Sequence, residues 1–301
     1  MMLDLAISAC GFCVGLLVGL TGMGGGSVMT ALLILVFGVH PVTAVGTDLL
    51  YAAVTKLTGT GAYWRNGNVD WRVVGLLAAG SIPATLVSLW FLSCAPLHSS
   101  EFSRGIAIAI GATLLVAAAS LGLRFHCHLG VSEMPHAHEA DRGRPVLTVG
   151  LGVILGVLVP LTSVGAGALG LAMLCYFFPR VPAVRLVGSD IAHAVPLTLL
   201  AGAGHWLFGN VDWNLFASLL LGSVPGILVG SHLAHRFPER HLLPACHRAR
   251  IDRRAVSHVV TTTSDTELHA ALTQFVSMVV TQIQFSYFGR VGRTNGRVLG
   301  Q

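Results

Sequence analysis

Stretches of apolar residues alternate with short polar connections along the first four fifths of the chain. A helix needs roughly 20 residues to cross the hydrocarbon core of a bilayer. Segments 27–37 and 166–178 are too short to cross alone, and each follows a glycine-rich break. The pattern predicts an all-α integral membrane protein with about eight or nine apolar segments, at 5–20, 27–37, 44–63, 73–93, 104–123, 146–161, 166–178, 187–207 and 214–233.

The two halves of the chain resemble each other. The pentapeptide GNVDW occurs at 67–71 and again at 209–213. At the same shift of 142 residues, GSIP is matched by GSVP and VGTD by VGSD, and at a shift of 141 residues LVGLTGMGGG (17–26) is matched by LVPLTSVGAG (158–167). An identical pentapeptide with three further matches at nearly the same shift indicates an internal duplication.

Composition supports a membrane location. Of the 301 residues, 53% are hydrophobic and 10% are charged, and the mean hydropathy is +0.74. Soluble domains carry about 25% charged residues. The net charge of +5 does not indicate nucleic-acid binding. The arginines lie in short loops, where basic residues determine how a membrane protein is oriented in the bilayer.

Basic residues are distributed unevenly between alternate loops. If the N-terminus lies outside and each segment crosses once, the outer loops have one basic residue nearby, Arg104. Positively charged loops face the cytoplasm. We therefore expect an external N-terminus and cytoplasmic linker and tail, and GNVDW then lies on opposite sides of the membrane in the two halves. Such inverted repeats are common in secondary transporters. Nine arginines occupy the inner loops: Arg65, Arg72, Arg124, Arg142, Arg144, Arg180, Arg185, Arg236 and Arg240.

Four regions follow from this pattern: a first transmembrane repeat (1–123), a His-rich cytoplasmic linker (124–145), a second repeat (146–240) and an atypical polar or amphipathic tail (241–301). The counterpart of segment 104–123 is expected near 246–265, where four arginines stand instead, so the final helix is missing from the pattern. The linker histidines match no standard zinc spacing, and we expect no metal site.

The glycine-rich stretch 19–30, GLTGMGGGSVMT, interrupts an apolar region. It lacks the spacing of a nucleotide-binding loop. Two interpretations stay open: close glycine packing between helices, or a broken helix whose first backbone N–H groups face a cavity and bind an anion. The second interpretation assigns substrate contacts to Thr21, Gly24, Gly25, Gly26 and Ser27, and, in the matching break of the second half, to Thr162, Gly165 and Gly167.

Lys56 is the only lysine in the chain and falls near the middle of segment 44–63. A cation at mid-span cannot easily reach the membrane surface. Three roles are open for Lys56. It contacts or gates an anionic substrate, it pairs with a carboxylate, or it extends along lipid towards the membrane surface. Direct pairing with Asp48 is not expected, because eight helical residues separate the two by about 12 Å.

Asp48 and Asp190 occupy equivalent places, each after VG and a hydroxyl residue. Helix capping is the favoured interpretation, and proton coupling or gating is the alternative, in which His193 shares. Asp70 and Asp212 of the two GNVDW copies are expected to cap helices, with the following tryptophans at the membrane interface.

The stretches GLTGMGGGSVMTALLILVFGVHPVTAVGTDLLYAAVTKLTG, GNVDWRVVGLLAAGSIPA and GSDIAHAVPLTLLAGAGHWLFGNVDW resemble the TauE/SafE sulfite-exporter family of bacterial permeases, over about residues 5–240. The resemblance implies an inner-membrane transporter of small sulfur-containing anions such as sulfite or organosulfonates, without enzymatic turnover. We expect no cofactor. Residues 241–301 depart from the family pattern, because a final apolar helix is expected there.

Two functional alternatives remain. An anion channel could use the same residues, and a copy lacking the last helix could have lost transport. A membrane enzyme is disfavoured, because no paired nucleophile and base, and no metal cluster, falls at membrane depth. The expected partners are a small anionic solute and the lipid bilayer.

Overall fold

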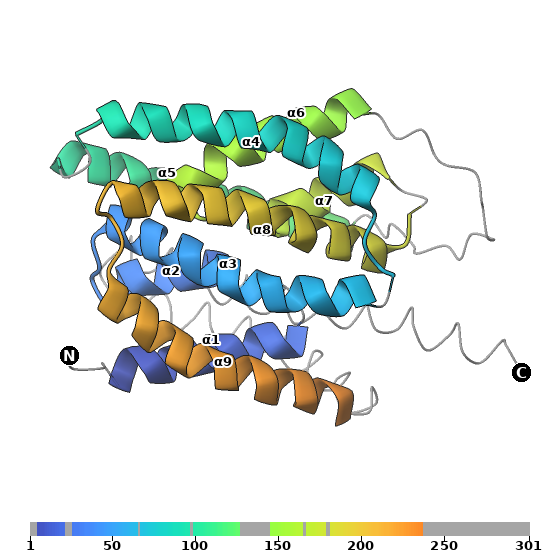
Figure 1. Cartoon of the computed structure of the whole chain (residues 1–301), viewed down its shortest axis with the longest axis horizontal. Coiled ribbons are helices and arrows are strands. Elements are labelled where there is room, and N and C mark those ends of the chain that lie inside the picture. The colour runs from blue at the N-terminus through green and yellow to red at the C-terminus, as the bar shows by residue number, and fades with distance from the viewer. Residues whose placement is uncertain are drawn as a thin grey trace, which may run out of the picture.

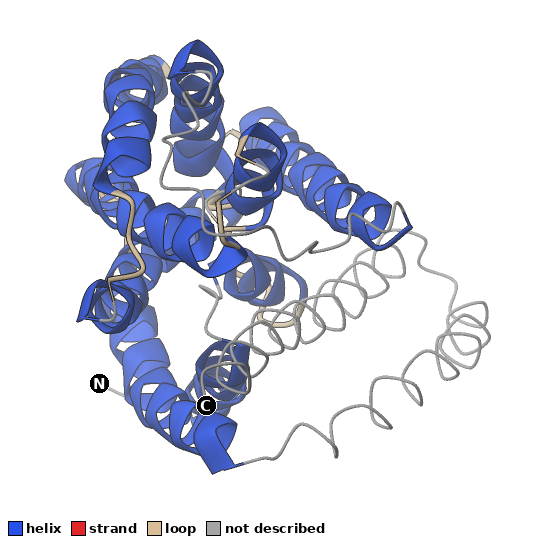
Figure 2. Cartoon of the chain, turned by 90° about the vertical axis from the view of Figure 1, so that its right-hand side faces the viewer, coloured by secondary structure: helices blue, strands red, loops and turns tan. Residues whose placement is uncertain are grey.

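The computed structural model describes residues 5–21, 26–65, 67–96, 99–126, 145–164, 167–178 and 181–236, and these form helices joined by short loops (Figures 1 and 2). The predicted all-α class is confirmed, and each predicted apolar segment corresponds to a helix. The helices are α1 (Leu5–Thr21), α2 (Gly26–Leu35), α3 (Pro41–Arg65), α4 (Trp71–Cys94), α5 (Ser100–His126), α6 (Pro145–Thr162), α7 (Ala168–Phe177), α8 (Ala183–Leu207) and α9 (Trp213–Arg236).

The helices fall into long and short classes. α2 and α7 have 10 residues each, which corresponds to about 15 Å and is too short to cross a bilayer. Four helical segments among the described residues are long and apolar enough to cross a membrane: Trp71–Cys94, Pro145–Thr162, Val184–Leu207 and Trp213–Gly230. The tail beyond residue 236, with its predicted missing helix, lies outside the described residues.

The long helices pack in pairs that join the two halves of the chain. α1 packs along α9, α4 along α6, and α3 along α8 (Figure 1). α3 and α8 run in opposite directions, since Gly59 approaches Ile191 while Gly202 approaches Leu50. Each half therefore contributes one member to every main pair, and neither half forms a separate bundle.

Contacts between helices recur in reciprocal form. Gly152 of α6 lies against the backbone of Leu77 in α4, and its counterpart Gly11 of α1 lies against the backbone of Leu219 in α9. The first repeat thus packs on the second as the second packs on the first. With α3 antiparallel to α8, this reciprocity shows two inverted repeats, as the sequence predicts.

The connections obey the same symmetry. The backbone N–H of Asp70 donates to Ser189 Oγ at 2.8 Å, and that of Asp212 donates to Thr47 Oγ1 at 3.1 Å. Both GNVDW loops thus attach to the equivalent helix of the other repeat. In each loop the aspartate Oδ1 also accepts two N–H groups of the next helix, so the predicted capping by Asp70 and Asp212 is confirmed.

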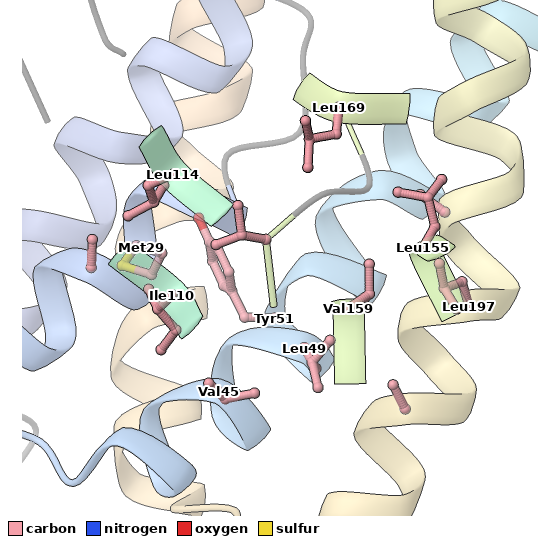
Figure 3. Packing of buried hydrophobic residues seen from close by; sticks show 14 of the residues in the cluster. Met29, Val45, Leu49, Tyr51, Ile110, Leu114, Leu155, Val159, Leu169 and Leu197 are labelled. Carbon is pink, nitrogen blue, oxygen red and sulfur yellow. The ribbon is translucent and has the colours of Figure 1, made fainter. Parts of the chain in front are cut away.

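Apolar side chains fill the interior and also cover the outside. Leu49 and Tyr51 of α3 belong to one buried cluster with Met29 of α2, Leu155 of α6 and Leu197 of α8 (Figure 3). The outer face of α4 exposes large apolar residues, as expected for a surface in contact with lipid: Leu86, Val87, Trp90 and Phe91.

Close packing of α6 on α4 depends on Gly152. A Cβ at this position would overlap the carbonyl oxygen of Leu77, whereas a Cβ at Gly150 on the same helix would meet nothing within 4 Å. Overpacking of this kind costs about 1–3 kcal/mol. We expect Gly152→Ala to lower the melting temperature of the purified protein and Gly150→Ala to leave it unchanged, measured by thermal aggregation in detergent. Equal melting temperatures would contradict this packing.

Candidate functional site

Three Asp, Glu, Lys or Arg side chains are buried among the residues that the structure describes. The exposed fractions are 0% for Asp48 and 4% for Lys56, both on α3, and 2% for Asp190 on α8. Charged side chains inside a membrane protein are costly and mark functional sites. Because Lys56 is buried in protein, it does not snorkel along lipid.

The favoured interpretation of Asp48 and Asp190 as helix caps is wrong. α3 begins at Pro41 and α8 begins at Ala183, so each helix starts seven residues before its aspartate. A capping carboxylate has to lie at the first turn to reach free N–H groups. Both side chains instead point into the bundle two turns further on.

The carboxylate of Asp48 binds two hydroxyl groups from other elements. Thr30 Oγ1 of α2 donates to Asp48 Oδ2, and Ser163 Oγ donates to the same oxygen at 2.7 Å. Asp48 Oδ1 is buried and has no hydrogen-bond partner in the described part of the chain. Neither Thr30 nor Ser163 was identified from the sequence, because nothing local to either residue indicates this contact.

Ser163 lies at the break between α6 and α7. Its φ angle of 55° is in the left-handed region, which a non-glycine residue adopts only at a cost. In the aligned first repeat this position is Gly22. The backbone turn at Ser163 thus directs a hydroxyl group towards Asp48 at a place where a glycine would supply none.

Asp190 has different neighbours from its counterpart Asp48. It packs against Gly170 in the first turn of α7, so closely that a Cβ there would overlap Oδ1. This Oδ1 atom has no hydrogen-bond partner among the described residues. The position that aligns with Thr30 is Leu171, so the second repeat has no equivalent of that hydroxyl.

The charge of Lys56 acts on both carboxylates. In the second repeat the equivalent position is Thr198, so a single cation serves two repeat-related anions. Buried charges are stable only when they are compensated. The three side chains therefore form one electrostatic unit across the α3–α8 contact.

His193 of α8 is fully buried, and its Nε2 forms a 2.8 Å hydrogen bond with Ser81 Oγ of α4. The symmetry-related residues are Tyr51 and Ser223. Their hydroxyl groups lie near each other, but neither makes a hydrogen bond within the described residues. Each of the two equivalent contacts, α4–α8 and α3–α9, thus has a polar pair, and only the pair at the α4–α8 contact has the geometry of a hydrogen bond.

The break after α6 is covered by side chains. His205 Nε2 is 2.8 Å from the carbonyl oxygen of Pro160, and it carries the proton because a carbonyl only accepts. Thr162 Oγ1 donates to the Leu158 carbonyl at 2.8 Å and accepts from the Val164 N–H at 3.2 Å. Thr162 is thus engaged with backbone groups of its own segment.

The glycine-rich contacts predicted from the sequence are placed only in part. Gly26 is the first residue of α2, and Gly167 precedes α7 with φ 132°. Gly24, Gly25 and Gly165, and the side chains of Thr21 and Ser27, lie outside the described residues. The His-rich linker also lies outside them, apart from its two ends, and the described residues contain no group of three His, Cys, Asp or Glu side chains that could hold a metal ion.

Comparison with known proteins identifies the family. Residues 7–246 match the family described as Sulfite exporter TauE/SafE. A protein of Bacillus subtilis (strain 168), "Probable membrane transporter protein YjnA", is 40% identical over 240 residues, which cover 80% of this chain and 94% of the relative. No solved structure matches the chain.

More distant relatives have similar names. "Probable membrane transporter protein YdhB" of B. subtilis is 25% identical, with 76% of this chain and 89% of the relative covered. A "Probable membrane transporter protein" of Xylella fastidiosa (strain 9a5c) is 27% identical, with 76% and 85% covered. With two inverted helical repeats and a buried charged centre, the chain belongs to the sulfite exporter TauE/SafE family of membrane transporters.

Proposed function

We propose that this membrane transporter moves a small sulfur-containing anion, such as sulfite or an organosulfonate, through the centre where α3 meets α8. The observation that carries the proposal is the buried Lys56, since a cation away from water attracts an anion far more strongly than one in bulk solvent. The name of the family, sulfite exporter, agrees with this substrate class.

The breaks before α2 and α7 supply the second part of the proposed site. A helix N-terminus presents free backbone N–H groups and a partial positive charge, which suit an oxyanion. We assign substrate contacts to residues at both breaks and to the buried lysine: Thr21, Gly24, Gly25, Gly26, Ser27, Lys56, Thr162, Gly165 and Gly167. A sulfonate or sulfite group would then contact donors from both repeats.

Asp48, Asp190 and His193 are assigned to coupling or gating. An arriving anion competes with both carboxylates for Lys56, so its binding alters the balance of charge at the centre. The Ser81–His193 pair closes one contact between the repeats, and Tyr51 faces Ser223 at the equivalent contact. Exchange between these two pairs would expose the centre alternately to each side, as inverted repeats permit.

The proposed location is a bacterial inner membrane with the N-terminus outside and the linker and tail in the cytoplasm. This orientation rests on the excess of arginine in alternate loops. An anion channel built from the same residues is the competing function. Saturable flux that accelerates when the opposite side contains unlabelled solute identifies a carrier, and flux without either property identifies a channel.

Lys56→Met should reduce the flux of radiolabelled sulfite or sulfoacetate into proteoliposomes at least about a hundredfold, since a buried ion pair or charge-assisted contact contributes roughly 3 kcal/mol or more. The matched control is Leu57→Met, which changes the adjacent residue of α3, 49% exposed on the outer surface. Wild-type flux in a folded Lys56→Met protein would remove this lysine from the site. Competition by unlabelled sulfite, sulfonates, sulfate and chloride then ranks the substrates.

Ser81→Ala removes the hydrogen bond to His193, which contributes about 0.5–1.5 kcal/mol. We expect the ratio of KM values measured from the two sides of oriented proteoliposomes to change about twofold to tenfold, because the contact between α4 and α8 becomes easier to open. Ser93→Ala is the control, since Ser93 is exposed on the same helix and its hydroxyl group contacts Trp90 and Cys94 of that helix. An unchanged ratio in Ser81→Ala would exclude this pair from gating.

A further inference from the structure

We propose that Asp48, Thr30 and Ser163 form a binding site for Na⁺, which is transported together with the anion. This inference rests on the proposed function, because it identifies the coupling ion of the same transport cycle. Two of the three residues that would bind Na⁺, Thr30 and Ser163, have no role in the proposed anion site.

Oxygen atoms from three separate elements converge at this point. Thr30 lies on α2, Asp48 on α3, and Ser163 at the break after α6, and both hydroxyl groups bond to the same carboxylate oxygen. Hard cations bind carboxylate, hydroxyl and carbonyl oxygens. A hydroxyl group retains lone pairs while it donates, so both hydroxyl oxygens can also act as ligands.

One oxygen atom of the Asp48 carboxylate accepts no hydrogen bond from the described residues. Asp48 is 0% exposed, and its Oδ1 atom has no hydrogen-bond partner in the described part of the chain. A buried acceptor without a partner is costly. A cation held between Oδ1 and the two hydroxyl oxygens would remove that cost.

The backbone around the site also favours a positive ligand. Ser163 directly follows the last residue of α6, Thr162, where a helix carries a partial negative charge on its terminal carbonyl groups. Broken helices in secondary transporters coordinate Na⁺ through such C-terminal ends. The left-handed φ of Ser163 places its hydroxyl group at that end.

Asymmetry between the repeats argues for a coordinated cation. The carboxylate of Asp190 occupies the equivalent place, but Leu171 and Gly22 stand where Thr30 and Ser163 would be expected. A carboxylate that only exchanges a proton needs no set of surrounding oxygen ligands, and the two positions that align with Thr30 and Ser163 carry no hydroxyl group in the other repeat. The hydroxyl pair therefore distinguishes Asp48 as the ion-binding carboxylate.

The charge near Asp48 suggests what a bound cation would do. Lys56 interacts electrostatically with both Asp48 and Asp190, so an anion that entered alone would place a further acidic group beside these two carboxyl groups. The groups of α3 that act on Asp48 are Lys56 and Tyr51. Na⁺ bound at Asp48 would compensate the charge of this carboxylate, so that the anion competes with one carboxylate fewer for Lys56.

Binding can be tested without any anionic substrate. In Na⁺-free buffer, the purified full-length protein is titrated with NaCl, KCl or choline chloride at constant ionic strength and pH. We expect Na⁺ alone to raise the melting temperature by about 4 °C or more, as a ligand specific for the folded state does. Asp48→Asn should abolish this shift, and Thr30→Val or Ser163→Ala should raise the half-maximal Na⁺ concentration at least about tenfold.

Thr113→Val is the matched control, because Thr113 is also buried but bonds to a carbonyl of its own helix, α5. It should retain the wild-type response to Na⁺. A wild-type protein whose melting temperature responds equally to all three salts would overturn the Na⁺ site, as would an undiminished response in both hydroxyl variants.

Transport separates the failure of this inference from the failure of the proposed function. Counterflow of labelled sulfite or sulfonate under equal ion concentrations tests the permease alone. An inward Na⁺ gradient at constant pH should then accelerate net uptake at least about tenfold in wild type and Thr113→Val, but not in Thr30→Val. If counterflow proceeds, but net uptake is driven by a pH gradient and not by a Na⁺ gradient, the proposed permease function stands and Na⁺ coupling is overturned.

Discussion

Backbone groups that leave a helix at membrane depth must be bonded by other parts of the protein, because lipid offers no partners. The chain meets this constraint at the break between α6 and α7. His205 donates to the Pro160 carbonyl, and the Thr162 hydroxyl bonds backbone groups on both sides of the turn. This cover allows the chain to bend inside the bundle, and Ser163 reaches Asp48 because of that bend.

Inverted duplication places the break, the charged residues and the interhelical contacts in pairs. The glycine contacts of α6 with α4 and of α1 with α9 preserve this symmetry. At the centre the symmetry is broken, because Lys56 is matched by the uncharged Thr198, and Thr30 by the apolar Leu171. The packing of the helices is therefore shared by the repeats, while the chemistry of the centre belongs to specific positions in each.

Much of the fold and part of the site could be predicted from residues alone. The positions of the helices, the two short helices and the caps at Asp70 and Asp212 follow from local apolar length and turn chemistry. Burial of Lys56 follows from its place in an apolar helix. The capping assignment for Asp48 and Asp190 was wrong. The apolar pattern places the starts of α3 and α8 at about residues 44 and 187, whereas the helices begin at Pro41 and Ala183.

The sequence by itself determined that this is a helical membrane protein of two inverted repeats, since hydrophobic length, charge in loops and internal similarity are properties of the linear chain. Only the tertiary structure decided which groups surround Asp48. Thr30 and Ser163 are far from each other in the chain, and their hydroxyl groups meet one carboxylate oxygen because α2, α3 and the end of α6 pack together. No local pattern encodes such a meeting, because it depends on how separate helices pack and where one of them breaks.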